Sequence, residues 1–446
     1  MKDFKPRTIQ NVKKKYGNDW SDMPVGQNLK GLSLSFCDLT DIILPKNKDF
    51  FKCLEKRSLK DSIMPDMDYN IYDFTGVDIR GTKFCRNSKL PETKDFFQII
   101  RDKSLYETEL PYGDYSKHNL NGVCLEGTKF TEDSKIFCDN VDVLQLLRNK
   151  NISRAVLPYD DYSNINFTDI NIEGVYFTEN SKIPNDKELF QIIAEKSINS
   201  CKMPKKDYSQ YNFRDVCINH TRFTKDSGLP KNEDFFINLK DKSIKGTYLP
   251  EDNYENMAFD DVEVKYCNFG ENSKLPKNRD FLQKLKGKNL RGCKMPKDDF
   301  SSYDFTRVDI EFTDFFDGCV LPNDIQLFQI ILNKSLRYTR LPIGDYSKFN
   351  FKDVYCYYTI FFEKSILPEH PYFFKDLSEK SGLDGRSSRI FFRKALCTDN
   401  VIANFHNYDL DGIYVNFNEL KEYLSEKQLA LLRIKYRDDK TKSNLI

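Results

Sequence analysis

Residues 197–242 read SINSCKMPKKDYSQYNFRDVCINHTRFTKDSGLPKNEDFFINLKDK, and this segment decides the fold. A large apolar residue stands at every fifth position of its first two thirds: Ile198, Met203, Tyr208, Phe213, Ile218 and Phe223. A helix repeats about every 3.6 residues and a strand about every 2, so neither element explains this spacing. A square coil does, because five residues then form one side and the central residue points to the axis.

The segment is one of seven similar blocks. They begin at Ser58, Ser104, Asn151, Ser197, Ser243, Asn289 and Ser335, and the last one ends at Lys380. The blocks are 46 residues apart, with one inserted residue in the second, and residues 28–57 form a partial copy ahead of them. Periods of roughly 20 to 50 residues are typical of solenoids, in which each repeat buries its apolar face against its neighbours.

A second set of positions supports the coil. In each five-residue side, here called a pentad, the residue two before the centre also points inward, and it must be small because the interior is narrow. In the second pentad of the seven blocks this position holds Ser62, Thr108, Ala155, Cys201, Thr247, Cys293 and Thr339. In the fifth pentad it holds Val in six blocks and Ile in one.

These positions give the chain a recognisable pattern. At Asn212-Phe213, Asp207-Tyr208 and Thr82-Lys83-Phe84-Cys85 the sequence resembles the pentapeptide-repeat family, whose pattern is a small residue, Asp or Asn, Leu or Phe, and two polar residues. The resemblance covers the six pentads of each block. It implies the right-handed quadrilateral β-helix of that family.

The rest of each block departs from the pattern, as in the stretch from Asn87 to Lys103. Pro91 interrupts strand pairing, Thr93 can cap a helix and Asp95 suits a helix N-terminus. Phe96, Phe97 and Ile100 follow as an apolar stripe, with counterparts in the other blocks at Phe50, Phe51 and Leu54, at Phe235, Phe236 and Leu239, and at Phe373, Phe374 and Leu377. The stretch predicts a helix of roughly nine residues. Six pentads, one Leu-Pro side and one helical side then make two square coils per block.

The fourth pentad predicts where the helices lie. Its inward position is mostly too large for a narrow interior, because it holds Tyr72, His118, Ile165, Tyr211, Met257, Tyr303 and Phe349. Two coils per block place this side next to the helical side. We therefore expect these side chains to pack against Phe96, Phe236, Phe374 and their equivalents, and the helices to form one ridge along a single edge.

Together these features predict a mainly β fold. The expected architecture is a right-handed quadrilateral β-helix, or solenoid, with one short α-helix per 46-residue repeat and a C-terminal cap helix. Residues 1–27 are expected to form an N-terminal cap and residues 28–57 a partial repeat. Residues 58–380 form the seven repeats, and residues 381–446 form a last coil and a helical cap.

Residues with catalytic or metal-binding chemistry are scattered. His118, His220, His370 and His406 fall in different parts of the chain, and no Cys pair has metal-ligand spacing. Cys201, Cys267 and Cys293 occupy small inward positions and are expected to be core thiols. Cys397, with His406 nearby, is the one candidate nucleophile, and it lacks any local signature. The sequence therefore predicts no catalytic, cofactor-binding or metal-binding residue.

The two ends of the chain also have a structural explanation. Residues 407–412 resemble the start of a calcium-binding EF-hand loop, but the twelfth position, where a bidentate Glu is needed, is Asn418. A last coil with centres at Phe405, Leu410, Val415 and Leu420 explains the segment better. Residues 419–437 are expected to form the cap helix. Residues 13–15 are all Lys and are expected to lie on a solvated N-terminal cap.

The composition limits the possible functions. The formal charge is +1 and no long apolar run occurs, so neither a nucleic-acid partner nor a membrane span is expected. No small-molecule ligand is indicated, and the start of the chain lacks the apolar segment of a secretory signal. We expect a cytoplasmic chain, or one exported without a standard signal, that acts as a non-enzymatic scaffold with a long protein-binding surface.

Three alternatives remain at this point. The family resemblance allows a DNA mimic that binds a topoisomerase, although the pentads of the fourth block are net positive rather than acidic. An enzyme with its site in residues 381–446 would depend on Cys397. An effector delivered into a host cell would fit the missing signal but has no residue evidence.

Overall fold

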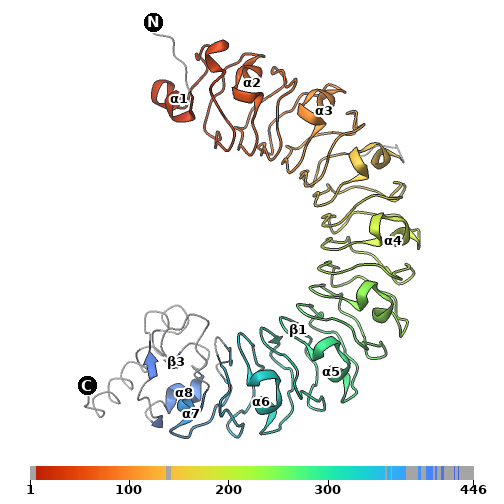
Figure 1. Ribbon diagram of the computed structural model, residues 1–446, viewed down its shortest axis with the longest axis vertical. Helices are drawn as coiled ribbons and strands as arrows, with labels where there is room; N and C mark the ends of the chain where they lie inside the picture. The colour runs from red at the N-terminus through yellow and green to blue at the C-terminus, as the bar shows by residue number, and fades with distance from the viewer. Residues whose placement is uncertain are drawn as a thin grey trace. The chain divides into compact units, whose positions relative to one another are not determined.

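The computed structural model describes residues 7–136, 142–356, 359–362, 364–377, 390–392, 398–404, 407–408, 413–415, 426 and 430. The chain divides into two compact units, Met1–Thr224 and Lys225–Ile446. Within each unit the chain winds in successive coils that stack on one another (Figure 1). Among the described helices, none has the length and apolar character needed to cross a membrane.

The backbone hydrogen bonds give the length of each coil. In the first unit Ile63 bridges to Lys83, twenty residues later, and Lys83 bridges to Glu109, twenty-six residues later. In the second unit Asn268 bridges to Lys294 and Asp314 to Arg340 with the longer step. The two steps alternate, so each 46-residue block forms two coils, as the eight predicted sides require.

The coils form a β-helix-like solenoid with little continuous strand. Most sides are joined by one isolated parallel bridge, because the chain turns again after five residues. The strands with defined bounds are β1 (Lys294–Met295), parallel to β2 (Asp314–Phe315), and β3 (Ile390–Phe392), parallel to β4 (Ile413–Val415). The prediction of a mainly β fold is therefore corrected. The coils stack like those of a β-helix, but isolated parallel bridges join them instead of long strands.

The core contains the residues that the five-residue period predicts. All six centres of the first block are buried: Leu59, Met64, Tyr69, Phe74, Ile79 and Phe84. The small inward residues of the second pentad, from Ser62 to Thr339, are fully buried as well. Several of them donate to carbonyl groups inside the coil, as Thr108 does from Oγ1 to the Ile79 carbonyl at 2.8 Å. The sequence indicated only their size.

The helices are shorter than predicted. In the first unit they are α1 (Ile9–Tyr16), α2 (Phe50–Cys53), α3 (Phe96–Ile99) and α4 (Leu189–Ile192). In the second unit they are α5 (Phe281–Lys284), α6 (Leu327–Ile330), α7 (Phe373–Asp376) and α8 (Asp399–Ala403). Two blocks have a 3-10 helix in place of the α-helix, η4 (Val143–Leu146) and η7 (Phe236–Asn238).

Further 3-10 turns complete the coils. One, η1 (Gln27–Leu29), precedes the first repeat. The others follow the helices: η2 (Glu55–Arg57), η3 (Arg101–Lys103), η5 (Arg148–Lys150), η6 (Ala194–Lys196), η8 (Lys240–Lys242), η9 (Lys286–Lys288) and η10 (Leu332–Lys334).

The expected nine-residue helix and its cap are both wrong. Helix α3 has four residues and ends because Ile100 is buried in an extended conformation, with φ −66° and ψ 159°. This residue turns the chain back toward the axis for the next side. Asp95 precedes the helix but makes no side-chain capping bond, and neither does Thr93.

The packing of the fourth pentad against the helices is confirmed. The ring of Tyr72 lies 4.8 Å from that of Phe51, and the ring of His118 lies 4.7 Å from that of Phe97. Tyr72, Tyr211 and Tyr303 are 4%, 7% and 4% exposed. Each tyrosine hydroxyl also donates to a proline carbonyl 27 residues earlier. Within each unit the helices of the repeats follow one edge (Figure 1). The side chain of Phe374 lies outside the described residues.

The N-terminal segment forms a helix with a solvated face. Thr8 caps α1 by accepting from the Asn11 amide, and Val12 is buried, whereas residues 13–15 are exposed. The cap helix predicted for 419–437, apart from residues 426 and 430, and three of the four predicted centres of the last coil, Phe405, Leu410 and Leu420, lie outside the described residues.

Candidate functional site

The described cysteines do not form a reactive centre. Cys201 and Cys293 are fully buried, and burial raises the pKa of each thiol to about 12. Each thiol donates to a carbonyl of the neighbouring coil, Cys201 to Ile172 and Cys293 to Val264. They are core thiols, as predicted. Cys397 and His406 lie outside the described residues.

The described histidines are not brought together. His118 packs on Phe97, and its Nδ1 lies 2.9 Å from the Thr93 carbonyl. Burial lowers the pKa of His118. His370 pairs with Asp376 at 3.6 Å. Among the described residues, no group of three His, Cys, Asp or Glu side chains is placed to hold a metal ion.

A recurring glutamine fastens the helical side to the next coil. Gln98 of α3 donates from Nε2 to the carbonyls of Asn119 and Asn121, at 2.8 and 3.1 Å. The same two bonds, to carbonyls 21 and 23 residues later, are made by Gln145, Gln191, Gln283 and Gln329. We call this arrangement the glutamine staple. It occurs in five blocks.

Two of the seven blocks have no glutamine at this position, and in the last block the residue is Lys375, whose side chain lies outside the described residues. In η7 the position of the glutamine is occupied by Ile237, and the two carbonyls it would reach belong to Ala258 and Asp260. Neither carbonyl accepts a hydrogen bond from any residue that the structure describes. Ala258 itself stands where other blocks have Asp or Asn, such as Asn119, whose Nδ2 reaches Asp95 at 3.4 Å.

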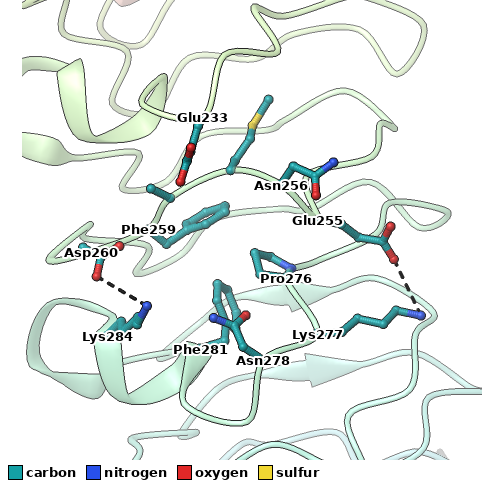
Figure 2. A pocket seen from close by; sticks show the side chains of 12 residues that line it. Glu233, Glu255, Asn256, Phe259, Asp260, Pro276, Lys277, Asn278, Phe281 and Lys284 are labelled. Carbon is teal, nitrogen blue, oxygen red and sulfur yellow. Dashed lines mark ion pairs between the residues drawn. The ribbon is translucent and has the colours of Figure 1, made fainter.

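Ala258 and Asp260, whose carbonyls the staple would reach, line a groove (Figure 2). Its volume is about 670 Å³, and we call it the open groove. Its lining includes Glu233, Met257, Ala258, Phe259 and Phe281. Two ion pairs lie at its opposite ends in Figure 2, Lys284 with Asp260 and Lys277 with Glu255, both at 3.7 Å. The groove lies wholly within the second unit.

A second surface of the second unit carries two exposed tyrosine rings, of Tyr266 and Tyr338, and the half-buried ring of Phe312. Tyr266 and Phe312 lie at the turn between the fifth and sixth pentads and Tyr338 lies at the turn between the first and second, with φ values of 59°, 61° and 55°. These turns stack along one edge in the order Tyr266, Gly292, Phe312 and Tyr338, because the Tyr266 amide donates to the Arg291 carbonyl and the Phe312 amide donates to the Arg337 carbonyl. The Phe312 and Tyr338 rings stack at 4.7 Å. The Arg291 guanidinium carbon lies 4.7 Å from the Phe312 ring centre, and that of Arg337 lies 5.4 Å from the Tyr338 ring centre. We call these five residues the aromatic turn.

Gly292 shows how the rings are accommodated. It has a φ of 71°, and a Cβ at this position would lie 2.2 Å from the Tyr266 ring. Only glycine fits both the backbone conformation and the ring above it. Neither the open groove nor the aromatic turn was predicted from the sequence. Departures from the repeat at Glu233, Ile237 and Ala258 were the signal that would have located the groove.

Solved structures of pentapeptide-repeat proteins are similar to parts of the chain. No family model and no curated protein matches the sequence. Two structures of trypsin-treated QnrB1, described as a plasmid-mediated fluoroquinolone resistance protein, are similar to the chain at 11% identity, with TM-scores of 0.13 and 0.14. They cover 53% and 58% of this chain and 81% and 87% of their own.

A third similar structure is HetL, a pentapeptide-repeat protein involved in heterocyst differentiation regulation in the cyanobacterium Nostoc. Its identity is 10% and its TM-score 0.12, over 69% of this chain and 84% of its own. TM-scores this low do not establish a common fold. The solenoid therefore rests on the hydrogen-bond register of the coils.

Proposed function

We propose that the chain is a non-enzymatic scaffold that binds another protein through the exposed surface of its solenoid. The proposal includes the finer architecture, a right-handed quadrilateral β-helix of the pentapeptide-repeat type, and a cytoplasmic location. The observation that supports the binding role most directly is the aromatic turn. Tyr and Arg side chains are enriched in the residues that contribute most to protein–protein affinity.

A comparison of the aromatic turn with other coils strengthens this proposal. A left-handed conformation costs a residue with a side chain roughly 1–2 kcal/mol. Other coils place either Gly at this turn, as at Gly81 and Gly127, or a polar residue in the same left-handed conformation, as at Asp61, Glu107 and Ser200. Three of four neighbouring coils instead place the rings of Tyr266, Phe312 and Tyr338 there, outside the core, and the fourth has Gly292. Because the conformation is common to these turns, the distinguishing feature is the partly exposed ring, which favours a role in binding over a role in stability.

The DNA-mimic alternative has less support. Such a mimic needs a continuous acidic face. On the third side of the first unit, acidic and basic residues alternate between coils, because Asp68 bridges to Lys89, Asp114 to Lys135 and Asp161 to Lys182. The alternation cancels the charge along that side.

The test removes the rings and leaves the fold. We expect the triple variant Tyr266→Gly, Phe312→Gly and Tyr338→Gly to keep its melting temperature and to lose at least tenfold of its affinity for the partner captured by the unaltered protein. Affinity is measured by titration after pull-down from lysate, with and without nuclease. The control changes the exposed Tyr112 and Tyr159 to Ser. Equal affinity of the triple variant, or capture that nuclease abolishes, would contradict the proposal.

A further inference from the structure

We propose that the open groove holds the guanidinium group of an arginine side chain of the partner protein. This inference rests on the proposed role as a protein-binding scaffold and names one chemical group that the partner supplies. It starts from a comparison between the blocks of this chain.

The five glutamine staples show which kind of group fits the place. In each of them a planar carboxamide donates two N–H bonds to carbonyls 21 and 23 residues further along, as Gln191 does to Asn212 at 3.1 Å and Arg214 at 2.8 Å. The open groove keeps the corresponding carbonyl pair, on Ala258 and Asp260, and has no described donor to either. A planar group with several N–H donors therefore matches the groove.

The charge in the groove selects a cation. The carbonyl of Glu233 accepts from the Ala258 amide. The equivalent residues in other blocks are basic or neutral: Lys94, Lys187, Arg279 and Ile325. Glu255 and Asp260 are paired with lysines, but Glu233 forms no ion pair with any described residue. The unbalanced charge in the groove is thus negative, which favours guanidinium over a neutral amide.

The shape of the groove fits an arginine stem. Ala258 removes the polar side chain that Asn212 directs to Glu188 at 3.0 Å in another block. Phe259 and Phe281 lie beneath the groove with ring centres 5.2 Å apart, and each is 2% exposed. In Figure 2 the Glu233 side chain extends from the upper edge toward Phe259. The methylene groups of an arginine would pack on this apolar floor while its head reaches the carbonyls and Glu233.

Lysine is the poorer ligand on geometric grounds. Its ammonium group is a compact point charge, whereas guanidinium carries five N–H donors in a fixed plane. A fixed plane can bond both carbonyls and the carboxylate together. We therefore expect the groove to prefer arginine to lysine as well as to the uncharged analogue citrulline.

The experiment uses the full chain labelled at its methionine methyl groups with ¹³C. Met257 lines the groove and reports on it by NMR, with its signal assigned by Met257→Leu. N-acetyl-argininamide is titrated against N-acetyl-lysinamide and N-acetyl-citrullinamide. We expect a saturable shift with arginine at a dissociation constant on the order of 1–10 mM, at least threefold weaker binding of lysine and no shift with citrulline. No shift with arginine, or equal shifts with all three, would overturn the proposal.

Two variants locate the binding. Ile237→Gln restores the staple seen in five blocks and should abolish the arginine shift without lowering the melting temperature, whereas the control Ile237→Leu should keep the shift. Glu233→Lys should weaken arginine binding at least fivefold. An undiminished arginine shift in Ile237→Gln would place the ligand elsewhere and refute the groove. If arginine causes no shift while the aromatic-turn variant still loses the partner, the groove proposal is wrong and the scaffold function stands. If arginine causes the expected shift while the aromatic-turn variant keeps the partner, the groove proposal stands and the proposed role of the aromatic turn is wrong.

Discussion

At the scale of single residues, size and hydrogen bonding together decide which side chain occupies the interior. The third pentad carries a buried tyrosine whose hydroxyl donates to the carbonyl of a proline four residues earlier: Tyr69, Tyr115, Tyr162, Tyr208, Tyr254 and Tyr346. The sixth block has Phe300 instead, and there the Cys319 thiol donates to the Pro296 carbonyl at 3.1 Å. A carbonyl facing the interior thus has a donor in both cases, because an unpaired buried carbonyl is costly.

The first prediction tests the buried centres. Phe213 is 4% exposed, and Phe213→Asp would place a carboxylate among apolar residues without a cation to pair with. We expect a loss of several kcal/mol in the free energy of unfolding, measured by urea denaturation followed by circular dichroism. Phe213→Leu is the control, since Leu120 fills the same position in another block. An Asp variant as stable as the unaltered chain would show that this side chain does not point inward.

At the scale of elements, the sequence predicts the coils better than the helices. The five-residue period and the small inward residues depend on how much room the interior of the coil leaves at each position. Because the block occurs seven times, this pattern can be recognised in the sequence. Helix length depends instead on the coil that the helix must complete. Ile100 has to enter the core in an extended conformation, so α3 stops after four residues although the apolar stripe continues.

The open groove shows a second limit of prediction at this scale. The groove results from what Ile237 and Ala258 do not supply, two N–H donors and a polar side chain. A search of the sequence for motifs finds side chains that can donate, accept or react. Ile and Ala have no such group, so neither residue marks a site by itself. Only the hydrogen bonds of the other five blocks reveal which group the place would otherwise hold.

The second prediction measures what one staple contributes. Gln191→Ile removes both bonds from α4 to the next coil, at Asn212 and Arg214. We expect the free energy of unfolding to fall by about 1 kcal/mol, because the staple is partly exposed and water replaces its bonds. The control is Gln210→Ile, where the exposed amide donates to the Ser209 hydroxyl at 3.4 Å. Equal effects of the two variants would mean that the staple does not fasten the helix.

At the scale of the whole molecule, the repeat multiplies small local effects. In six blocks an aspartate at the start of the third side accepts from the amide two residues later: Asp68, Asp114, Asp161, Asp207, Asp299 and Asp345. The pKa is lowered for five of these carboxyl groups, those of Asp68, Asp114, Asp161, Asp299 and Asp345. For Asp161 a hydrogen bond from the Ser163 side chain is the largest cause, and the pKa falls to about 2. Because the stability of a solenoid is close to a sum over its repeats, the five contributions should add.

The last prediction is therefore an acid-sensitive fold. A carboxyl group whose pKa is lower in the folded chain stabilises that chain fully above its ordinary pKa of 3.8, and the contribution is lost as the pH falls toward the folded value. We expect a smaller decrease in the melting temperature below pH 6.5, from the lowered pKa of His118, and a steep decrease between pH 4 and about 2 from the carboxyl groups. Asn253 occupies the same position in another block and accepts from the Glu255 amide at 2.9 Å, so asparagine keeps the turn without a titrating group. The triple variant Asp114→Asn, Asp161→Asn and Asp345→Asn should consequently lose less of its melting temperature between pH 5 and 2.5 than the unaltered chain. An equal loss would assign the acid sensitivity to other carboxylates, such as Asp73, which accepts from Lys52 at 2.9 Å.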